Sequence, residues 1–266
     1  MKPKFSLSFW VIIILGIFLI SFRILSPPDN ILSWDVFGYY LYLPAKFIYH
    51  NLSLTDQSWL KELVQKHDTS TTLYQIVQVD NGNWVIKYSM GLAILFTPFF
   101  FIGHWVAQLT GYPADGLSLP YQYTLAAGGI VFALIGLFYF RKVLRYFFSE
   151  KITVILLILI FAGTNYFQLT AFGGTLLTHN FLFTFYAMLL WYTLRWHEKP
   201  SIFRALMIGG LCGFMTLIRP TEIVSLLIPL LWNIWNKESF REKWLMIRKK
   251  YLHVIIAGLT MQRAAA

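Results

Sequence analysis

The 266-residue chain is rich in apolar residues and poor in charged ones. Hydrophobic residues make up 57% of it, aromatic residues 18% and charged residues only 13%. This composition is typical of a polytopic membrane protein and excludes a water-soluble globular domain. The net charge of +10 is gathered beside apolar runs, as the positive-inside rule describes, so we expect no nucleic-acid binding.

The basic residues form clusters that orient the apolar runs. If every cluster lies on the cytoplasmic side, the runs between them alternate in direction and predict six spans, with a seventh beginning near Leu252. The clusters are Lys2 and Lys4; Arg141, Lys142, Arg145 and Lys151; Arg195, Lys199 and Arg204; and Lys237, Arg241, Lys243, Arg248, Lys249 and Lys250. The predicted spans are residues 5–25, 121–140, 152–167, 179–194, 202–218 and 222–235.

A further apolar run, residues 90–109, is long enough to span by hydropathy alone. A full crossing would place Arg141, Lys142 and Arg145 outside the membrane, against the positive-inside rule. We therefore predict that this run lies in the outer interface or re-enters, a course that Pro98 favours. Residues 26–120 then form one external loop with juxtamembrane helices. Within it, residues 72–79 and 84–88 flank a Gly turn and predict a β-hairpin.

Residues 34–47 carry an acidic group at the membrane surface. As a helix they present a polar-aromatic stripe and an apolar stripe that fits the interface. The polar stripe holds Asp35, Tyr39, Tyr42 and Lys46, and the apolar stripe holds Val36, Tyr40, Leu43 and Phe47. We expect Pro44 to break this helix. Asp35 is either a functional carboxylate or, with Ser33, a cap of the helix, and both interpretations stay open.

Few other polar residues reach the outer face in this topology. They are Lys46, Lys87, His104, Asn165, Gln168, His179, Asn180, Arg219 and Glu222. An ionisable residue at membrane depth is costly unless it is paired or functional, so Arg219 and Glu222 either serve a site or pair with each other. His179 either belongs to the site or anchors the start of a span. The sequence has no phosphate-binding Gly loop and no metal-ligand spacing.

Several motifs resemble those of the GT-C membrane glycosyltransferases, among them the aminoarabinose transferases of lipid A and the protein O-mannosyltransferases. The resemblance extends over nearly the whole chain. The motifs are Asp35 shortly after the first span, Lys87-Tyr88-Ser89-Met90-Gly91 leading to Leu95 and Pro98, Gly163-Thr164-Asn165-Tyr166-Phe167 leading to Thr178-His179-Asn180, and a Gly-rich span that ends in Arg219-Pro220. The second acidic residue that many relatives carry beside the first is absent, because Val36 follows Asp35.

The resemblance implies an all-α, GT-C-like bundle of about six to seven transmembrane helices. It implies transfer of a sugar from a polyprenyl-phosphate donor, with inversion, to an external acceptor in the cell envelope, which is a lipid, a glycan or a protein. We expect no cofactor and no metal, and a multi-pass protein of the bacterial inner membrane with its active site on the periplasmic face. By this resemblance Asp35 is the general base, Lys87 and Arg219 bind the donor phosphate, and Tyr39, Tyr42, Tyr88, His179 and Glu222 contact the substrate.

Two alternatives remain at this point. The aromatic residues near Asp35, with Trp34 among them, are either sugar-stacking groups or an interfacial belt. A non-catalytic transporter subunit or a scaffold for surface polysaccharide assembly would need the same spans and charges. A transporter should show repeated halves, which the sequence lacks. Because residues 254–261 are too short to span, we expect residues 1–266 to be the N-terminal module of a longer protein and a poor enzyme alone.

Overall fold

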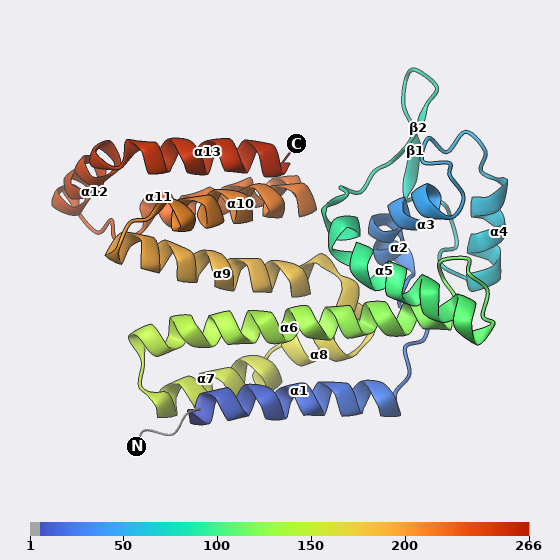
Figure 1. The fold of residues 1–266 in the computed structure, drawn as a ribbon, viewed down its shortest axis with the longest axis horizontal. Helices are drawn as coiled ribbons and strands as arrows, with labels where there is room; N and C mark the ends of the chain where they lie inside the picture. Colours follow the sequence, from blue (N-terminus) through green and yellow to red (C-terminus); the bar gives the residue numbers. More distant parts are fainter. Residues whose placement is uncertain (1–5, 266) are drawn as a thin grey trace.

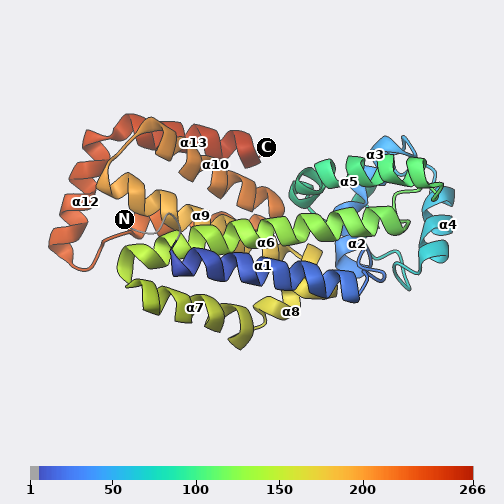
Figure 2. The same ribbon diagram turned by 60° about the horizontal axis from the view of Figure 1, so that its bottom comes forward.

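The computed structural model describes residues 6–265, so Lys2, Lys4 and Phe5 of the predicted elements lie outside the described residues. Long helices lie side by side in a bundle, and the remaining elements gather at its two ends (Figures 1 and 2). The bundle consists of α1 (Leu7–Leu25), α6 (Leu119–Phe147), α7 (Glu150–Gly163), α8 (Tyr166–Ala171), η1 (Gly173–Leu176), α9 (Thr178–Glu198), α10 (Ile202–Ile218), η2 (Pro220–Leu226), α11 (Leu227–Leu231) and α13 (Tyr251–Ala265).

The segment between α1 and α6 covers one end of the bundle, and we call it the end layer. It consists of α2 (Trp34–Tyr40), α3 (Tyr42–Phe47), α4 (Ser58–His67), β1 (Ile76–Gln78), β2 (Trp84–Ile86) and α5 (Gly91–Thr110). At the opposite end α12 (Lys237–Lys249) connects α11 to α13. One hydrophobic core joins the end layer to α6, α9 and α10, and a second joins α1 to α6, α7 and α8.

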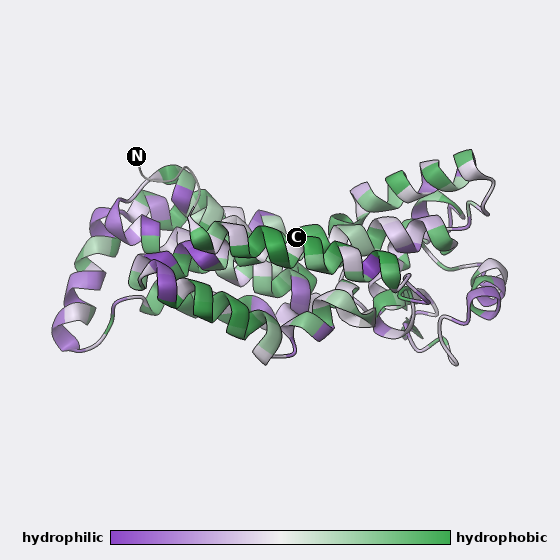
Figure 3. Cartoon of the chain, turned by 90° about the horizontal axis from the view of Figure 1, so that it is seen from below, coloured by the Kyte–Doolittle hydropathy of each residue, from purple (hydrophilic) through white to green (hydrophobic). Residues whose placement is uncertain are grey.

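The protein is an all-α integral membrane protein, as the sequence predicted. Within residues 6–265 three helices are long and apolar enough to cross a membrane: α1, α5 and α6. Their outward faces carry large apolar side chains, such as Ile14 and Ile17 on α1. Figure 3 shows that hydrophobic residues dominate the long helices, whereas hydrophilic residues gather towards the ends. The predicted runs after residue 150 appear as α7 with α8, α9, α10, and η2 with α11.

Helix α5 begins beside the bundle and points away from it. Near its start, Phe96 lies 5.5 Å, between ring centroids, from Phe181 of α9, and Phe181 in turn contacts Phe132 of α6. Further along, His104 forms a 2.5 Å hydrogen bond with the hydroxyl of Tyr121 at the start of α6. Helix α5 therefore runs antiparallel to α6 and covers only its first turns. Length and hydropathy permit a span, so the statement that residues 90–109 do not cross stays a prediction.

The amphipathic pattern of residues 34–47 is confirmed, but the predicted break is one turn too late. The helical hydrogen-bond pattern is interrupted at Leu41, whose backbone angles stay helical, and Pro44 lies inside α3. A proline removes the hydrogen bond to the carbonyl four residues earlier, here Tyr40, so the interruption appears before the proline. Val36, Tyr40 and Leu43 of the apolar stripe are buried within the protein.

Phe47 differs from the rest of the apolar stripe, because it is 38% exposed. Tyr40 packs between Phe96 and Phe100, with ring centroids 6.4 and 6.1 Å away, so this stripe packs mainly on α5 and not in the lipid interface.

The predicted β-hairpin is present with shorter strands. Strands β1 and β2 pair antiparallel, with Ile76 opposite Ile86. The turn includes Gly82 at φ +83°, a left-handed conformation that glycine adopts without strain. The hairpin sets the position of Tyr74, just before β1, and of Lys87 and Tyr88, just after β2.

Candidate active site

Asp35 is held by two tyrosines of the end layer. It is the second residue of α2, and its carboxylate is exposed. Its Oδ1 accepts a hydrogen bond of 2.8 Å from the Tyr74 hydroxyl and one of 2.5 Å from the Tyr88 hydroxyl. The capping interpretation is wrong, because Ser33 donates to the Asn30 carbonyl and caps no helical N–H. Within residues 6–265 no side chain donates to Oδ2, so this oxygen is open to a substrate.

Helix α2, which carries Asp35, also packs against the Tyr88 ring. Gly38 lies one turn after Asp35 on the same face, and a Cβ added there would collide with the Tyr88 ring. The Tyr39 ring meets the Tyr88 ring edge-on at 4.7 Å between centroids, and the Tyr42 hydroxyl donates to the Tyr88 carbonyl at 2.5 Å. Together with the hydrogen bond to Asp35, these contacts mean that three residues of the predicted polar stripe, Asp35, Tyr39 and Tyr42, contact Tyr88.

Both tyrosine hydroxyls remain protonated donors at neutral pH. Burial raises the pKa of Tyr88, and the hydrogen bond to Asp35 raises it further. The same two causes raise the pKa of Tyr74. A phenol beside a carboxylate keeps its proton because ionisation would place two negative charges together. The tyrosines therefore donate to Asp35 and do not compete with it as bases.

Lys87 lies beside the same tyrosines. Its Nζ is 4.7 Å from the centroid of the Tyr74 ring and 5.6 Å from that of the Tyr88 ring, within the range of cation–π attraction. Its side chain is exposed, and no carboxylate in the described part of the chain lies within ion-pair distance of it. The structure thus places an unpaired cation next to the tyrosines that hold Asp35.

Arg219 reaches this end of the bundle from α10. The start of α5 packs tightly on the end of α10, since a Cβ added to Gly91 would lie 2.6 Å from the backbone nitrogen of Ile218. Burial raises the pKa of Tyr39, the charge of Arg219 opposes this rise, and the charge of Asp35 adds to it. Tyr39 therefore lies within the electrostatic reach of both charged groups.

Glu222 does not pair with Arg219, so the expectation that they form an ion pair is wrong. The Glu222 carboxylate accepts a 2.5 Å hydrogen bond from the Tyr186 hydroxyl of α9, and it meets Arg219 only through a backbone hydrogen bond. Pro220 and the turn that follows it carry the two side chains apart. Among the described residues Arg219 has no carboxylate partner, which leaves its charge available to an anion.

His179 lies exposed in the first turn of α9. Within residues 6–265 its ring makes no hydrogen bond. No described contact joins it to Asp35, Tyr74, Tyr88 or Lys87, which we call the Asp35 group. Its place in the site stays a prediction, and so does that of Glu222. Neither residue is brought next to Asp35 by a described contact.

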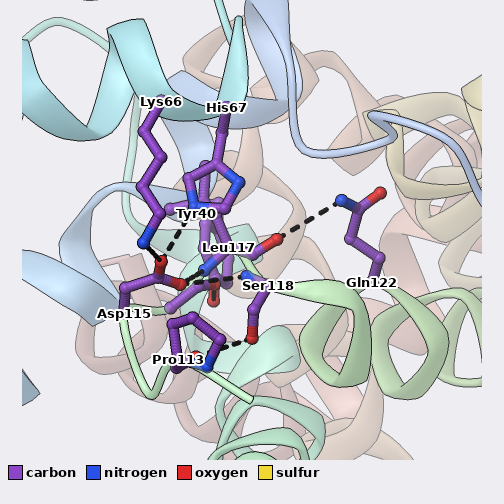
Figure 4. A network of polar contacts seen from close by, with 9 residues as sticks. Tyr40, Lys66, His67, Pro113, Asp115, Leu117, Ser118 and Gln122 are labelled. Atoms are coloured by element: carbon purple, nitrogen blue, oxygen red, sulfur yellow. Dashed lines mark hydrogen bonds and ion pairs between the residues drawn. The ribbon is translucent and has the colours of Figure 1, made fainter.

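Sequence reasoning missed Tyr74 and the ion pairs around Asp115. Nothing in the local pattern marks Tyr74 as a partner of a residue 39 positions earlier. Asp115 precedes α6, and its Oδ2 accepts from Lys66 Nζ and His67 Nε2 of α4, both at 2.8 Å (Figure 4). The only available signal was a charged residue within a stretch rich in Gly and Pro.

The Asp115 carboxylate also fixes the loop before α6. Its Oδ1 accepts from the N–H groups of Leu117 and Ser118, both at 3.0 Å. Burial opposes the charged form, but hydrogen bonds from His67, Lys66 and Leu117 more than offset burial and hold the pKa of Asp115 well below its usual range. This network joins α4 to the α5–α6 loop, so it positions the end layer and is not itself part of the candidate site.

The Asp35 group is an open surface. An apolar cleft exists elsewhere, between α10, α12 and α13, and it is lined by residues such as Ile208, Ile247 and Ala257. It lies towards the α12 end of the bundle and contains none of the candidate site residues. Within residues 6–265 no group of three or more His, Cys, Asp and Glu residues is arranged to hold a metal ion.

The chain was compared with known families, curated proteins and solved structures. A family model described as dolichyl-phosphate-mannose-protein mannosyltransferase matches residues 122–262, which is more than half of the chain. No curated protein and no solved structure matches. The matched segment runs from α6 to α13 and includes His179, Arg219 and Glu222, whereas Asp35 and Lys87 lie before it.

Proposed function

The chain belongs to the dolichyl-phosphate-mannose-protein mannosyltransferase family and is a membrane glycosyltransferase of the GT-C kind, and on this premise we propose its reaction. It transfers a sugar from a polyprenyl-phosphate donor, with inversion at the anomeric carbon, to an acceptor at the membrane surface. The donor's lipid tail lies in the bilayer beside the helices, and its sugar phosphate reaches the end layer. The observation that carries this proposal is an exposed carboxylate, Asp35, close to the unpaired cation of Lys87.

Asp35 acts as the general base. Tyr74 and Tyr88 hold Oδ1, so Oδ2 faces the acceptor hydroxyl or amine and takes its proton as the acceptor attacks the sugar. A base must be positioned within hydrogen-bond reach of the proton that it removes, and two hydrogen bonds to one oxygen restrict the carboxylate to a narrow range of orientations.

Lys87 and Arg219 bind the phosphate of the donor. The bond from the anomeric carbon to the phosphate oxygen breaks, and the phosphate leaves with an added negative charge. Cations placed beside that oxygen stabilise the charge as it develops, and hydrogen bonds between charged groups are stronger than neutral ones. Neither cation has a carboxylate partner in the described part of the chain, which suits a site that receives an anion.

The aromatic residues divide into two roles. The hydroxyls of Tyr42 and Tyr88 are occupied by protein contacts, so these side chains shape the site and contact the sugar only through their rings. Trp34, next to Asp35 and 53% exposed, offers a free ring on which a sugar can stack. Tyr39, which feels the charges of both Asp35 and Arg219, contacts the sugar.

The acceptor is a lipid, a glycan or a protein, and in this proposal the membrane is the bacterial inner membrane. The charge clusters support an orientation with the end layer on the external, periplasmic face. In that orientation the basic residues at the ends of α6, α9 and α12 lie in the cytoplasm. In this proposal His179 and Glu222, which belong to the matched segment, bind the acceptor substrate.

The test is transfer of a radiolabelled sugar from a polyprenyl-phosphate donor by the purified protein in nanodiscs, with Lys87→Ala as the variant. Lost hydrogen bonds to a charged group are worth roughly 1.5–3 kcal/mol, so we expect KM for the donor to rise about 10- to 100-fold. Lys61→Ala, at an exposed lysine of α4, is the matched control and should change KM less than about 2-fold. Equal effects of both variants would remove Lys87 from the site.

A further inference from the structure

A basic groove lies between α6 and α9, at the end of the bundle opposite the Asp35 group. It is lined by Arg141, Lys142, Arg145, Tyr146 and Trp191. Four of these residues belong to the last two turns of α6, and Trp191 belongs to the last two turns of α9. The groove thus combines three cations with two aromatic side chains of the types that gather at membrane interfaces.

Two of the three cations are already held by protein groups. Arg145 forms an ion pair of 2.9 Å, from Nε to Oε2, with Glu150 at the start of α7. Arg141 donates to the Ser8 hydroxyl at 2.6 Å and to the Ser6 hydroxyl, which are neutral acceptors. Among residues 6–265 no carboxylate forms an ion pair with Arg141, although the charge of Glu150 acts on it from a greater distance.

Lys142 is the cation without a polar partner. Its Nζ lies 4.5 Å from the ring centroid of Phe138, 4.7 Å from that of Tyr139 and 5.5 Å from that of Trp191. Among residues 6–265 no carboxylate lies within ion-pair distance of it, and the nearby Glu198 is paired with Arg195. An ammonium group within an aromatic wall attracts an anion that approaches from the open side.

Exposed aromatic residues in and beside the groove indicate which anion it receives. Tyr146, which lines the groove, is 48% exposed, and Phe147 and Phe148, which follow it in the chain, are 54% and 45% exposed. A free phosphate ion would gain nothing from these side chains, whereas the acyl chains of a lipid would cover them. Basic pockets between transmembrane helices are known to receive anionic lipid head groups.

We propose that this groove binds the phosphate group of an anionic glycerophospholipid from the surrounding bilayer. Lys142 and Arg141 bind the phosphate, and the acyl chains pass the exposed aromatic residues at the end of α6. The site is independent of the sugar-transfer site, because the two lie at opposite ends of the bundle (Figure 1).

The first test measures lipid binding to the purified chain by native mass spectrometry, with phosphatidylglycerol and phosphatidylcholine as probes. A basic residue at a membrane surface contributes about a 5-fold gain in affinity for anionic lipid. We expect the parent to bind phosphatidylglycerol at least about 5-fold more tightly than phosphatidylcholine. Lys142→Gln should lose this preference, and Lys142→Arg should retain it. Lys151→Gln, at an exposed lysine of α7 outside the groove, is the matched control and should behave as the parent.

Three results would overturn the proposal: equal binding of the two lipids by the parent, equal effects of the two Gln variants, or displacement of phosphatidylglycerol by equimolar inorganic phosphate. A second measurement does not depend on any variant that fails to fold. A photoactivatable phosphatidylglycerol is crosslinked to the unmodified chain, and the site is mapped by peptide mass spectrometry. Crosslinks to residues 138–148 or 187–195 support the proposal, and crosslinks found only elsewhere contradict it.

Discussion

Replacement of Asp115 should release α4 from the α5–α6 loop while the transmembrane helices stay folded. The carboxylate binds Lys66 and His67 of α4 through one oxygen and the backbone N–H groups of Leu117 and Ser118 through the other. Asp115→Ala removes every one of these hydrogen bonds. Asp115→Asn retains an oxygen for the two N–H groups but turns an amide group towards two basic residues.

The expected magnitudes follow from the burial of each partner. The Asp115 side chain is 12% exposed, so the two N–H groups left unpaired by alanine cost about 1–3 kcal/mol each. Lys66 is 47% exposed, and such a pair contributes about 1 kcal/mol or less. We expect a loss of roughly 3 kcal/mol for Asp115→Ala and roughly 1 kcal/mol for Asp115→Asn.

Hydrogen exchange of the α4 amides measures this local stability directly. The alanine variant should exchange about 100-fold faster in residues 58–67, and the asparagine variant about 5-fold faster, with α6 and α9 unchanged. Equal exchange in parent and Asp115→Ala would refute the role given to this network. Faster exchange throughout the bundle would show that Asp115 supports the whole fold and not only the end layer.

Because of the same carboxylate, the strength with which α4 is held depends on pH. Because the pKa of Asp115 is lowered in the folded state, its stabilising effect is fully present above the ordinary aspartate pKa near 4. The effect is lost as the pH falls below that value towards the folded-state pKa. Exchange of α4 in the parent, corrected for its intrinsic rate, should therefore accelerate below about pH 4, and Asp115→Asn should lack this acceleration.

Three further predictions concern the end layer. Gly91→Ala should lower the melting temperature by several degrees in a scanning-fluorimetry assay, because the added Cβ would lie 2.7 Å from the Leu217 carbonyl oxygen; an unchanged melt would contradict the close packing of α5 on α10. Gly38→Ala should displace the Tyr88 ring and reduce sugar transfer at least about 10-fold with a smaller effect on the melt, and parental transfer would show that Tyr88 does not position Asp35. Single cysteines at Asp80 and Tyr112, on either side of α5, should react with an impermeant maleimide from the same side of the membrane, whereas labelling from opposite sides would show that α5 crosses.

The sequence predicted those parts of the end layer that follow from local periodicity. The burial of Val36, Tyr40 and Leu43 follows from helical spacing, and the hairpin follows from a Gly turn between two β-prone runs. The error at Pro44 was also local, since a missing N–H acts on the preceding turn.

The partners of Asp35 could not be predicted in the same way. Tyr74 and Tyr88 are 39 and 53 residues away, and they meet at Asp35 because the pairing of β1 with β2 brings the two ends of the hairpin together. The pairing of Glu222 with Tyr186 likewise depends on how α9 lies against η2. Such contacts are set by tertiary packing, which leaves no periodic trace in one sequence.

The measurement that tests the central claim most directly is sugar transfer by Asp35→Asn, beside the parent, from a labelled polyprenyl-phosphate donor in nanodiscs. The asparagine oxygen can still accept from Tyr74 and Tyr88, so the variant should melt like the parent. Loss of the proton acceptor should reduce the transfer rate roughly 10²- to 10⁴-fold. A variant that folds and transfers sugar at nearly the parental rate would show that Asp35 is not the base and would contradict the proposed site.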